Sequence, residues 1–220
     1  MHRKDAFQFT ELKTENKDDR RFYITPDGAA YPSITTVLKL LSHKSIMEWR
    51  KRVGNDVANA ISAKASRRGT AVHYMCEDYI NNLNPCHKER MPADIETFKS
   101  IQPVIDENIN NIYAQEIPLF SNYLKLAGRV DCVAEWGGKL SIIDFKTSRK
   151  VKKKEWIDNY FMQASGYAVM FEELTGQPIT NLVILIAVDD NPPQVFVEHR
   201  DKWIHKLIDT RKQYEELYGI

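Results

Sequence analysis

The chain has 220 residues, of which 43% are hydrophobic, and a formal net charge of +1 at pH 7. This length predicts one large domain, or one domain with a helical appendage, and leaves room for a true core. The near-neutral charge excludes a surface that is basic throughout, so any nucleic-acid site must be a local patch. The three cysteines form no CxxC pair, which predicts reduced thiols and excludes a disulfide scaffold.

Targeting signals are not evident in the sequence. It contains no apolar run long enough for a membrane span, and its first residues lack the apolar segment of a signal peptide. They also have no evident transit-peptide character. We therefore expect a cytoplasmic protein with no membrane association, of phage or bacterial origin rather than from the mitochondrial matrix.

The first half of the chain is predicted to be mainly helical after two short extended segments. Ser33 is a candidate N-cap, and Gly54 is a candidate stop signal for the helices that follow. The predicted elements, in order, are strands at Arg21–Thr25 and Ala30–Tyr31, a helix from Ser33 through Leu41, a second helix from about Ser45, and a long polar helix from about Asp56 to Asn82.

The second half is predicted to alternate between strands and helices. Asp94 is a candidate cap for a helix whose inward residues include Phe98 and Ile101, and Pro103 is expected to kink it. The predicted strands are Ile112–Leu119, Tyr123–Trp136, Lys139–Thr147, Asn181–Val188 and Gln194–Glu198. The predicted helices are Glu155–Leu174, with Trp156, Tyr167 and Leu174 facing the core, and Asp201–Tyr218. Helices on both faces of a mixed sheet make the fold class α/β or α+β.

The most informative stretch is GRVDCVAEWGGKLSIIDFKTS, residues 128–148. Its Gly137-Gly138 pair predicts a tight hairpin turn, because a type I′ turn needs positive φ at both central positions. If Trp136 and Lys139 close that turn, side-chain alternation assigns the two faces of the hairpin. Val133 and Ile142 then lie on one face, and Val130, Cys132, Ile143 and Phe145 lie on the other.

Four charged residues fall on the first of these faces. The same register places Asp131 opposite Asp144 and Arg129 opposite Lys146. Two opposed carboxylates repel each other, and a divalent cation with its preference for oxygen ligands would offset that repulsion. The alternative is that Arg129 and Lys146 simply neutralise the two aspartates. The residues alone favour neither interpretation.

The order of several motifs resembles the RecB-like exonuclease branch of the PD-(D/E)xK nuclease superfamily. The pattern there is a histidine on a helix, an aspartate on one strand, D-x-K on the next strand and Q-x-x-x-Y on the following helix. This chain has GTAVH ending at His73, then Asp131, then the Asp144-Phe145-Lys146 triplet, then Gln163 with Tyr167. The resemblance implies a restriction-endonuclease-like core with an N-terminal helical segment. The departure is Asp-x-Lys where this branch commonly has Glu-x-Lys.

The resemblance implies a metal-dependent mechanism. Asp131, Asp144, the backbone carbonyl of Phe145 and His73 would hold Mg²⁺ or Mn²⁺, and Glu116 would bind a second metal or shape the site. The catalytic residues would be Asp131, Asp144 and Lys146, with Lys146 orienting the attacking water and stabilising developing negative charge. Without the resemblance, a lone histidine on a helix is more often a surface or core residue.

Nucleic-acid contacts are also implied. Gln163 and Tyr167 lie one helical turn apart and would border the active site. Arg149 and Lys150 follow the catalytic strand as a candidate phosphate track, and Arg67 and Arg68 are a second candidate. Each of these sets has a structural alternative, namely a packed tyrosine or solvated basic loops.

We therefore expect one nuclease domain over residues 1–220. Within it, residues 1–20 are a candidate flexible tail, 45–82 a candidate helical arch and 112–200 the sheet core. The expected function is metal-dependent exonuclease cleavage of single-stranded DNA from a free end, by a monomer, in replication, recombination or repair. Three alternatives stay open: an exonuclease acting on duplex ends, a structure-specific endonuclease, and a non-catalytic DNA-binding module.

Overall fold

The computed structural model describes residues 7–87 and 90–220, and two sheets organise this part of the chain. The larger sheet has the strand order β4-β5-β6-β7-β8, in which only β6 and β7 pair in parallel. The smaller sheet is antiparallel, with the order β1-β2-β3. The strands are β1 (Lys13–Lys17), β2 (Arg20–Ile24), β3 (Ala30–Pro32), β4 (Ile109–Ser121), β5 (Leu126–Trp136), β6 (Lys139–Ser148), β7 (Asn181–Val188) and β8 (Gln194–His199).

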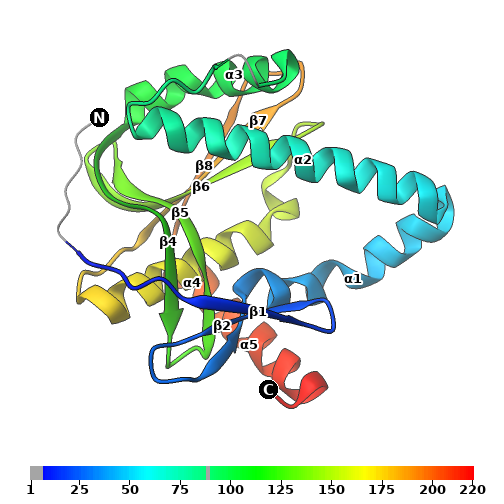
Figure 1. The fold of residues 1–220 in the computed structure, drawn as a ribbon, viewed down its shortest axis with the longest axis vertical. Coiled ribbons are helices and arrows are strands. Elements are labelled where there is room, and N and C mark those ends of the chain that lie inside the picture. The colour runs from blue at the N-terminus through cyan, green and yellow to red at the C-terminus, as the bar shows by residue number, and fades with distance from the viewer. Residues whose placement is uncertain (1–6, 88–89) are drawn as a thin grey trace.

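Helices cover both faces of the larger sheet, as the sequence predicted. One face packs against α2 and α3, and the opposite face packs against α1, α4 and α5 (Figure 1). The parallel β6–β7 pair needs a crossover connection, and α4 provides it. The helices are α1 (Ile34–Val53), α2 (Asn55–Ile80), α3 (Pro92–Asn108), α4 (Asp158–Thr175) and α5 (Asp201–Tyr218), with a short 3₁₀ turn, η1 (Lys154–Trp156), before α4.

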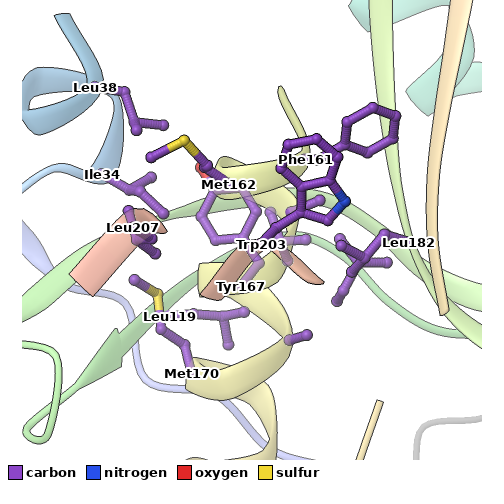
Figure 2. Close-up of a cluster of buried hydrophobic side chains, with 14 of the residues drawn as sticks. Ile34, Leu38, Leu119, Phe161, Met162, Tyr167, Met170, Leu182, Trp203 and Leu207 are labelled. Atoms are coloured by element: carbon purple, nitrogen blue, oxygen red, sulfur yellow. The ribbon is translucent and has the colours of Figure 1, made fainter. Parts of the chain in front are cut away.

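The largest hydrophobic core cluster among the described residues lies beneath α4. Figure 2 shows Phe161 and Trp203 together in this cluster, and their rings stack with centroids 4.9 Å apart. Tyr167 and Ile34 lie in the same cluster, so α4 links the start of α1 to the sheet. The second core, between the sheet and the α2–α3 pair, includes Phe98, which is fully buried.

Two helix boundaries follow the sequence signals. Ser33 Oγ accepts a hydrogen bond from the Thr36 N–H at 3.1 Å, so Ser33 caps α1, an interaction worth about 1 kcal/mol. Gly54 ends α1 with a φ of +87°, which a residue with a Cβ adopts only at a cost. The second helix expected from about Ser45 is instead the continuation of α1, because nothing between Leu41 and Ser45 breaks the helix.

Other boundaries correct the sequence predictions. Asp94 does not cap α3, since Pro92 already occupies the first turn and Asp94 lies buried inside the helix. Trp156 and Leu174 were expected in the core, yet the Trp156 residue is 61% exposed in the 3₁₀ turn and Leu174 is also exposed. β5 begins at Leu126, which leaves Tyr123 exposed in the turn before it.

Part of the candidate N-terminal tail forms regular structure. Lys13–Lys17 forms β1, and Phe7 contacts the Phe171 ring edge-on at a centroid distance of 5.4 Å. Every residue of β1 is exposed, so the strand carries no alternation of apolar residues by which the sequence could reveal it. Residues 1–6 of the expected tail lie outside the described residues.

The candidate arch corresponds to a long helical arm. α1 and α2 meet at Gly54, and their meeting point projects away from the larger sheet (Figure 1). Most residues between Leu41 and Arg67 are exposed, which fits a part of the fold that is not packed on the core. Across the described residues, no helix combines the length and apolar character needed to cross a membrane.

Candidate metal and nuclease site

The Gly137-Gly138 hairpin forms as predicted. Trp136 pairs with Lys139, and the same register continues as far as Cys132 opposite Ile143. Both glycines have positive φ, +55° and +81°, as the turn requires.

The regular pairing between β5 and β6 ends at Cys132. The Asp131 carboxylate takes the place of a ladder acceptor, because its Oδ2 accepts the backbone N–H of Phe145 at 2.9 Å. Asp131 and Asp144 were expected to face each other as a ladder pair, but the β5–β6 ladder ends before them, at Cys132 and Ile143. Val130 was also predicted to share a face with Cys132, but it packs in the same core cluster as Val133. Alternation therefore fails at Asp131, just beyond Cys132, where the β5–β6 pairing ends.

Arg129 is a second departure from the predicted arrangement. It was expected opposite Lys146, as a counter-ion for the aspartates. Its guanidinium instead donates from Nη1 to the Glu116 carbonyl oxygen on β4, and from Nη2 to Glu11 Oε2, before β1, at 2.7 Å. The simple neutralisation of both aspartates by Arg129 and Lys146 is therefore wrong for Arg129.

Glu116 has a left-handed backbone in the middle of β4. Its φ is +51°, although its neighbours Gln115 and Ile117 pair regularly with Cys132 and Val130 of β5. This conformation costs a non-glycine residue about 1–2 kcal/mol. Strain of this kind concentrates at functional sites, where surrounding contacts maintain it.

His73, Glu116 and Asp131 form a compact cluster. His73 Nε2 lies 2.7 Å from Asp131 Oδ2, and His73 Nδ1 lies 3.2 Å from Glu116 Oε1. One ligand atom from each of the three residues falls within 4.8 Å of the others, a spacing that suits a shared metal ion. α2 supplies the histidine because Val72 and Cys76 bury that helix against the sheet.

Asp144 and Lys146 lie beside this cluster. Lys146 Nζ is 2.5 Å from Asp144 Oδ2 and 5.3 Å from the centre of the Tyr160 ring. Despite this short ion-pair distance, neither Asp144 oxygen accepts a hydrogen bond of good geometry from the described residues. A carboxylate that is only 1% exposed is seldom left in that state. Its oxygens are therefore well placed for a ligand that the protein itself does not supply.

The electrostatics of the cluster favour bound protons in the absence of metal. Burial alone would lower the pKa of His73, but the hydrogen bond and charge of Asp131, together with Glu116 and Asp144, raise that pKa to about 9. Burial raises the pKa of Glu116 to about 7, with Asp131 adding to the effect and His73 opposing it.

The two aspartates respond in opposite directions. Burial raises the pKa of Asp144 to about 6, because it outweighs the attraction of Lys146. Burial also disfavours ionised Asp131, but the hydrogen bond and charge of His73 keep the pKa of Asp131 below its ordinary value. The pKa of Lys146 is raised, since the charges of Asp144 and Asp131 overcome burial, so Lys146 is a cation at neutral pH.

The donor set fits a divalent cation. Carboxylate oxygens suit Mg²⁺ and Mn²⁺, and an imidazole ligand favours Mn²⁺ over Mg²⁺. A cation would replace the protons on His73 and Glu116 and would supply partners for the Asp144 oxygens. The ligand role assigned to the Phe145 carbonyl stays a prediction.

The two candidate nucleic-acid surfaces differ in their surroundings. Arg67 donates to Asp94 of α3 at 2.7 and 3.4 Å, and Arg68 donates to Asp189, in the turn after β7, at 2.6 Å. Both arginines are therefore already held in ion pairs within the protein. Arg149 and Lys150 are exposed directly after β6. The second pair is therefore better placed to meet a phosphate backbone.

Sequence reasoning missed Trp156 as a surface aromatic. Lys153 Nζ lies 5.3 Å from its ring centre, in the segment that continues from Arg149 and Lys150. The signal was present in the sequence, because a tryptophan two residues after a basic run is a candidate base-stacking residue.

Gln163 and Tyr167 lie one turn apart on α4, as predicted. Gln163 Nε2 donates to the Tyr167 hydroxyl at 3.3 Å. Tyr167 is only 2% exposed, so it supports Gln163 from within the core. Gly128 leaves room for the Tyr167 ring, since a Cβ there would come within 2.8 Å of Tyr167 Cε1.

The arrangement of a mixed sheet, helices on both faces and a carboxylate–lysine cluster at the β5–β6 hairpin describes a nuclease of the restriction-endonuclease type. The sequence profile of the PD-(D/E)XK nuclease superfamily matches residues 87–216, more than half of the chain. The protein belongs to this superfamily. Its members generally use divalent metal ions, in keeping with the donor set described above.

Among named proteins, the chain is similar to mitochondrial genome maintenance exonuclease 1 of three vertebrates. It is 25% identical to the Xenopus tropicalis protein over 205 residues, which is 84% of this chain and 58% of that protein. It is 30% identical to the Mus musculus protein over 132 residues and 28% identical to the Homo sapiens protein over 131 residues, each 55% of this chain and 38% of the relative. The chain thus spans about half the length of these relatives, or less.

Proposed function

We propose that this protein is a metal-dependent exonuclease that hydrolyses the phosphodiester bonds of single-stranded DNA from a free end. The observation that carries the proposal is the cluster of partly buried His73 and Glu116 with buried Asp131 and Asp144, and with the Lys146 ammonium at its edge. The exonuclease names of the similar proteins support the same reaction class.

The proposed metal ligands divide between three elements. His73 comes from α2, Glu116 from β4, and the two aspartates from the β5–β6 hairpin. Mg²⁺ or Mn²⁺ bound here would supply Lewis acidity to the scissile phosphate and make a water molecule more acidic. The buried position of the aspartates keeps the surrounding dielectric low, which strengthens every charge interaction at the site.

Lys146 is proposed to act as an electrostatic catalyst. Because its pKa is raised, it stays protonated at neutral pH and does not serve as the general base. Its ammonium can donate to the attacking water or to a phosphate oxygen, and it stabilises the negative charge that grows there. The face of the Tyr160 ring, 5.3 Å away, restricts where that ammonium can move.

Single-stranded DNA is the proposed substrate because an exposed aromatic residue and several basic residues follow the D-x-K strand, β6, in the chain. Trp156 with Lys153 offers a stacking surface beside positive charge, and Arg149 and Lys150 precede them. The last turn of α1, before Gly54, carries the basic residues Arg50, Lys51 and Arg52. These residues of the α1–α2 arm would guide the DNA strand. We expect the enzyme to act as a monomer.

The proposal is tested with end-labelled substrates. Linear single strands, blunt duplexes and branched duplexes are incubated with purified protein in Mg²⁺, Mn²⁺ or EDTA, with Asp144→Asn as the inactive control. Degradation of the single strand, only with metal and only by the wild type, is the expected result. Preferred degradation of duplex ends would make it a duplex exonuclease, internal cuts at branches would make it an endonuclease, and binding without cleavage would make it a DNA-binding module. Each of these three results contradicts the proposal.

A further inference from the structure

Arg129 contacts the backbone of a residue in the metal cluster without belonging to that cluster. Its Nη1 donates to the carbonyl oxygen of Glu116, the residue with φ of +51°. Its Nη2 donates to Glu11 Oε2 at 2.7 Å, in the segment before β1. The guanidinium fork therefore joins the N-terminal segment to β4 at the strained position.

The strained peptide determines where the Glu116 carboxylate lies. Gln115 and Ile117 pair with β5, and Glu116 lies between these two ladder pairs. Gln115 lies on the α2 face, where its Nε2 donates to the Glu77 carbonyl oxygen, whereas Ile117 packs against the core beneath α4. With an ordinary extended φ, alternation would place the Glu116 side chain on the face opposite to Gln115, away from α2. The left-handed φ instead accompanies a carboxylate that lies 3.2 Å from His73 Nδ1.

We propose that Arg129 is a positioning residue for the metal site: by binding the Glu116 carbonyl, it holds the left-handed conformation that presents the Glu116 carboxylate to the cluster. A charged donor forms a stronger hydrogen bond than a neutral one, and the planar fork fixes its direction. Glu11 orients the fork from outside. This inference rests on the metal dependence in the proposed function.

For metal affinity, simple electrostatics and the positioning role predict opposite effects of removing Arg129. A guanidinium near a divalent cation repels it, so loss of the positive charge would by itself tighten metal binding. The positioning role predicts weaker binding, because Glu116 is released from the conformation that serves the site. The sign of the change in metal affinity therefore separates the two explanations.

The test is a double-mutant cycle read out by Mn²⁺ affinity, measured calorimetrically on metal-free protein. Arg129→Met is expected to weaken Mn²⁺ binding about tenfold, the lower end for partners that orient metal ligands. Glu116→Ala is expected to weaken it as well, and adding Arg129→Met to Glu116→Ala should cause no further loss. Arg200→Met is the matched control, because Arg200 is also a partly buried arginine with two acceptors, the carboxylates of Glu172 and Asp201, and its loss should leave the affinity unchanged.

Several outcomes would overturn the inference. Unchanged or tighter binding by Arg129→Met, or losses that add in the double variant, would each show that Arg129 does not act through Glu116. If Arg129→Met fails to fold, Arg129→Gln carries the same prediction with a side chain better suited to a half-buried strand position. A wild-type protein that binds no Mn²⁺ would overturn the proposed function as well, so the two failures are distinguishable.

Discussion

His73 Nε2 and Asp131 Oδ2 lie 2.7 Å apart, although α2 supplies one residue and β5 the other. The contact joins a cationic imidazole to a carboxylate whose second bond comes from the Phe145 N–H. In the metal-free protein, a shared proton joins the imidazole and the carboxylate that a metal ion would join by coordination.

The effect of metal on stability should depend on pH. The folded-state pKa values of His73, Glu116 and Asp144, about 9, 7 and 6, lie above their ordinary values of 6.5, 4.5 and 3.8. A raised folded-state pKa contributes stability below the ordinary value and loses it as the pH rises through the folded value. The metal-free protein should therefore lose these contributions between about pH 4 and about pH 9.

Metal binding should compensate this loss, because a cation binds the deprotonated ligands. The rise in melting temperature caused by Mn²⁺, relative to EDTA, should grow between about pH 6 and about pH 8.5. Differential scanning calorimetry at several pH values measures it. In His73→Ala the growth should be smaller, and a Mn²⁺ effect that shrinks with rising pH in the wild type would refute the ligand assignment.

Substitutions of Lys146 and Asp144 should separate effects on catalysis from effects on metal binding. Lys146→Met should lower kcat about 10²- to 10³-fold, the range for loss of one electrostatic catalyst, while Mn²⁺ still binds. Asp144→Ala should abolish cleavage and also weaken Mn²⁺ binding. Single-turnover cleavage and calorimetric titration of both variants provide the two readouts. Full activity in Lys146→Met would show that the D-x-K assignment is wrong.

Gly128 should be intolerant of a side chain. An alanine Cβ there would lie 2.8 Å from Tyr167 Cε1 and 3.2 Å from Ile34 Cγ2, so Gly128→Ala should cost about 1–3 kcal/mol of unfolding free energy. Gly69→Ala is the matched control, because its Cβ would meet Thr147 Oγ1 at an ordinary 3.6 Å. Inside α2 the control should stabilise the fold by about 0.5–1 kcal/mol. Equal urea midpoints for the two variants would contradict the packing argument.

The exposed basic pair after β6 should contribute to the salt dependence of DNA binding. Replacing Arg149 and Lys150 with alanine should reduce the slope of log affinity against log salt concentration by about 1.4 for a single strand. Arg67→Ala should instead lower the melting temperature, because it leaves the buried Asp94 without its ion-pair partner. Fluorescence anisotropy with an Asp144→Asn background measures the slope, and an equal reduction by Arg67→Ala would contradict this division of roles.

Much of the sheet and several caps could be predicted because local signals specify them. Gly137-Gly138 determined the hairpin register as far as Cys132, and Ser33 marked the start of α1. The charged D-x-K triplet in an apolar strand identified the part of the molecule that contains the acidic cluster.

The finer geometry depends on contacts that no local pattern contains. The left-handed φ of Glu116 is maintained by neighbouring strands, and Arg129 meets Glu11 across more than half of the chain. An expected pairing of Arg129 with Lys146 followed strict alternation, which the Asp131 carboxylate interrupts. The exposed strand β1 carries no apolar periodicity at all.

The dependence on a free end is the central claim, and one matched pair of substrates tests it most directly. A single-stranded oligonucleotide is labelled internally, half of it is ligated into a circle, and both forms are incubated with the protein and Mn²⁺. The account predicts that the linear form is degraded to small products while the circle remains intact. Cleavage of the circle at a comparable rate would contradict it.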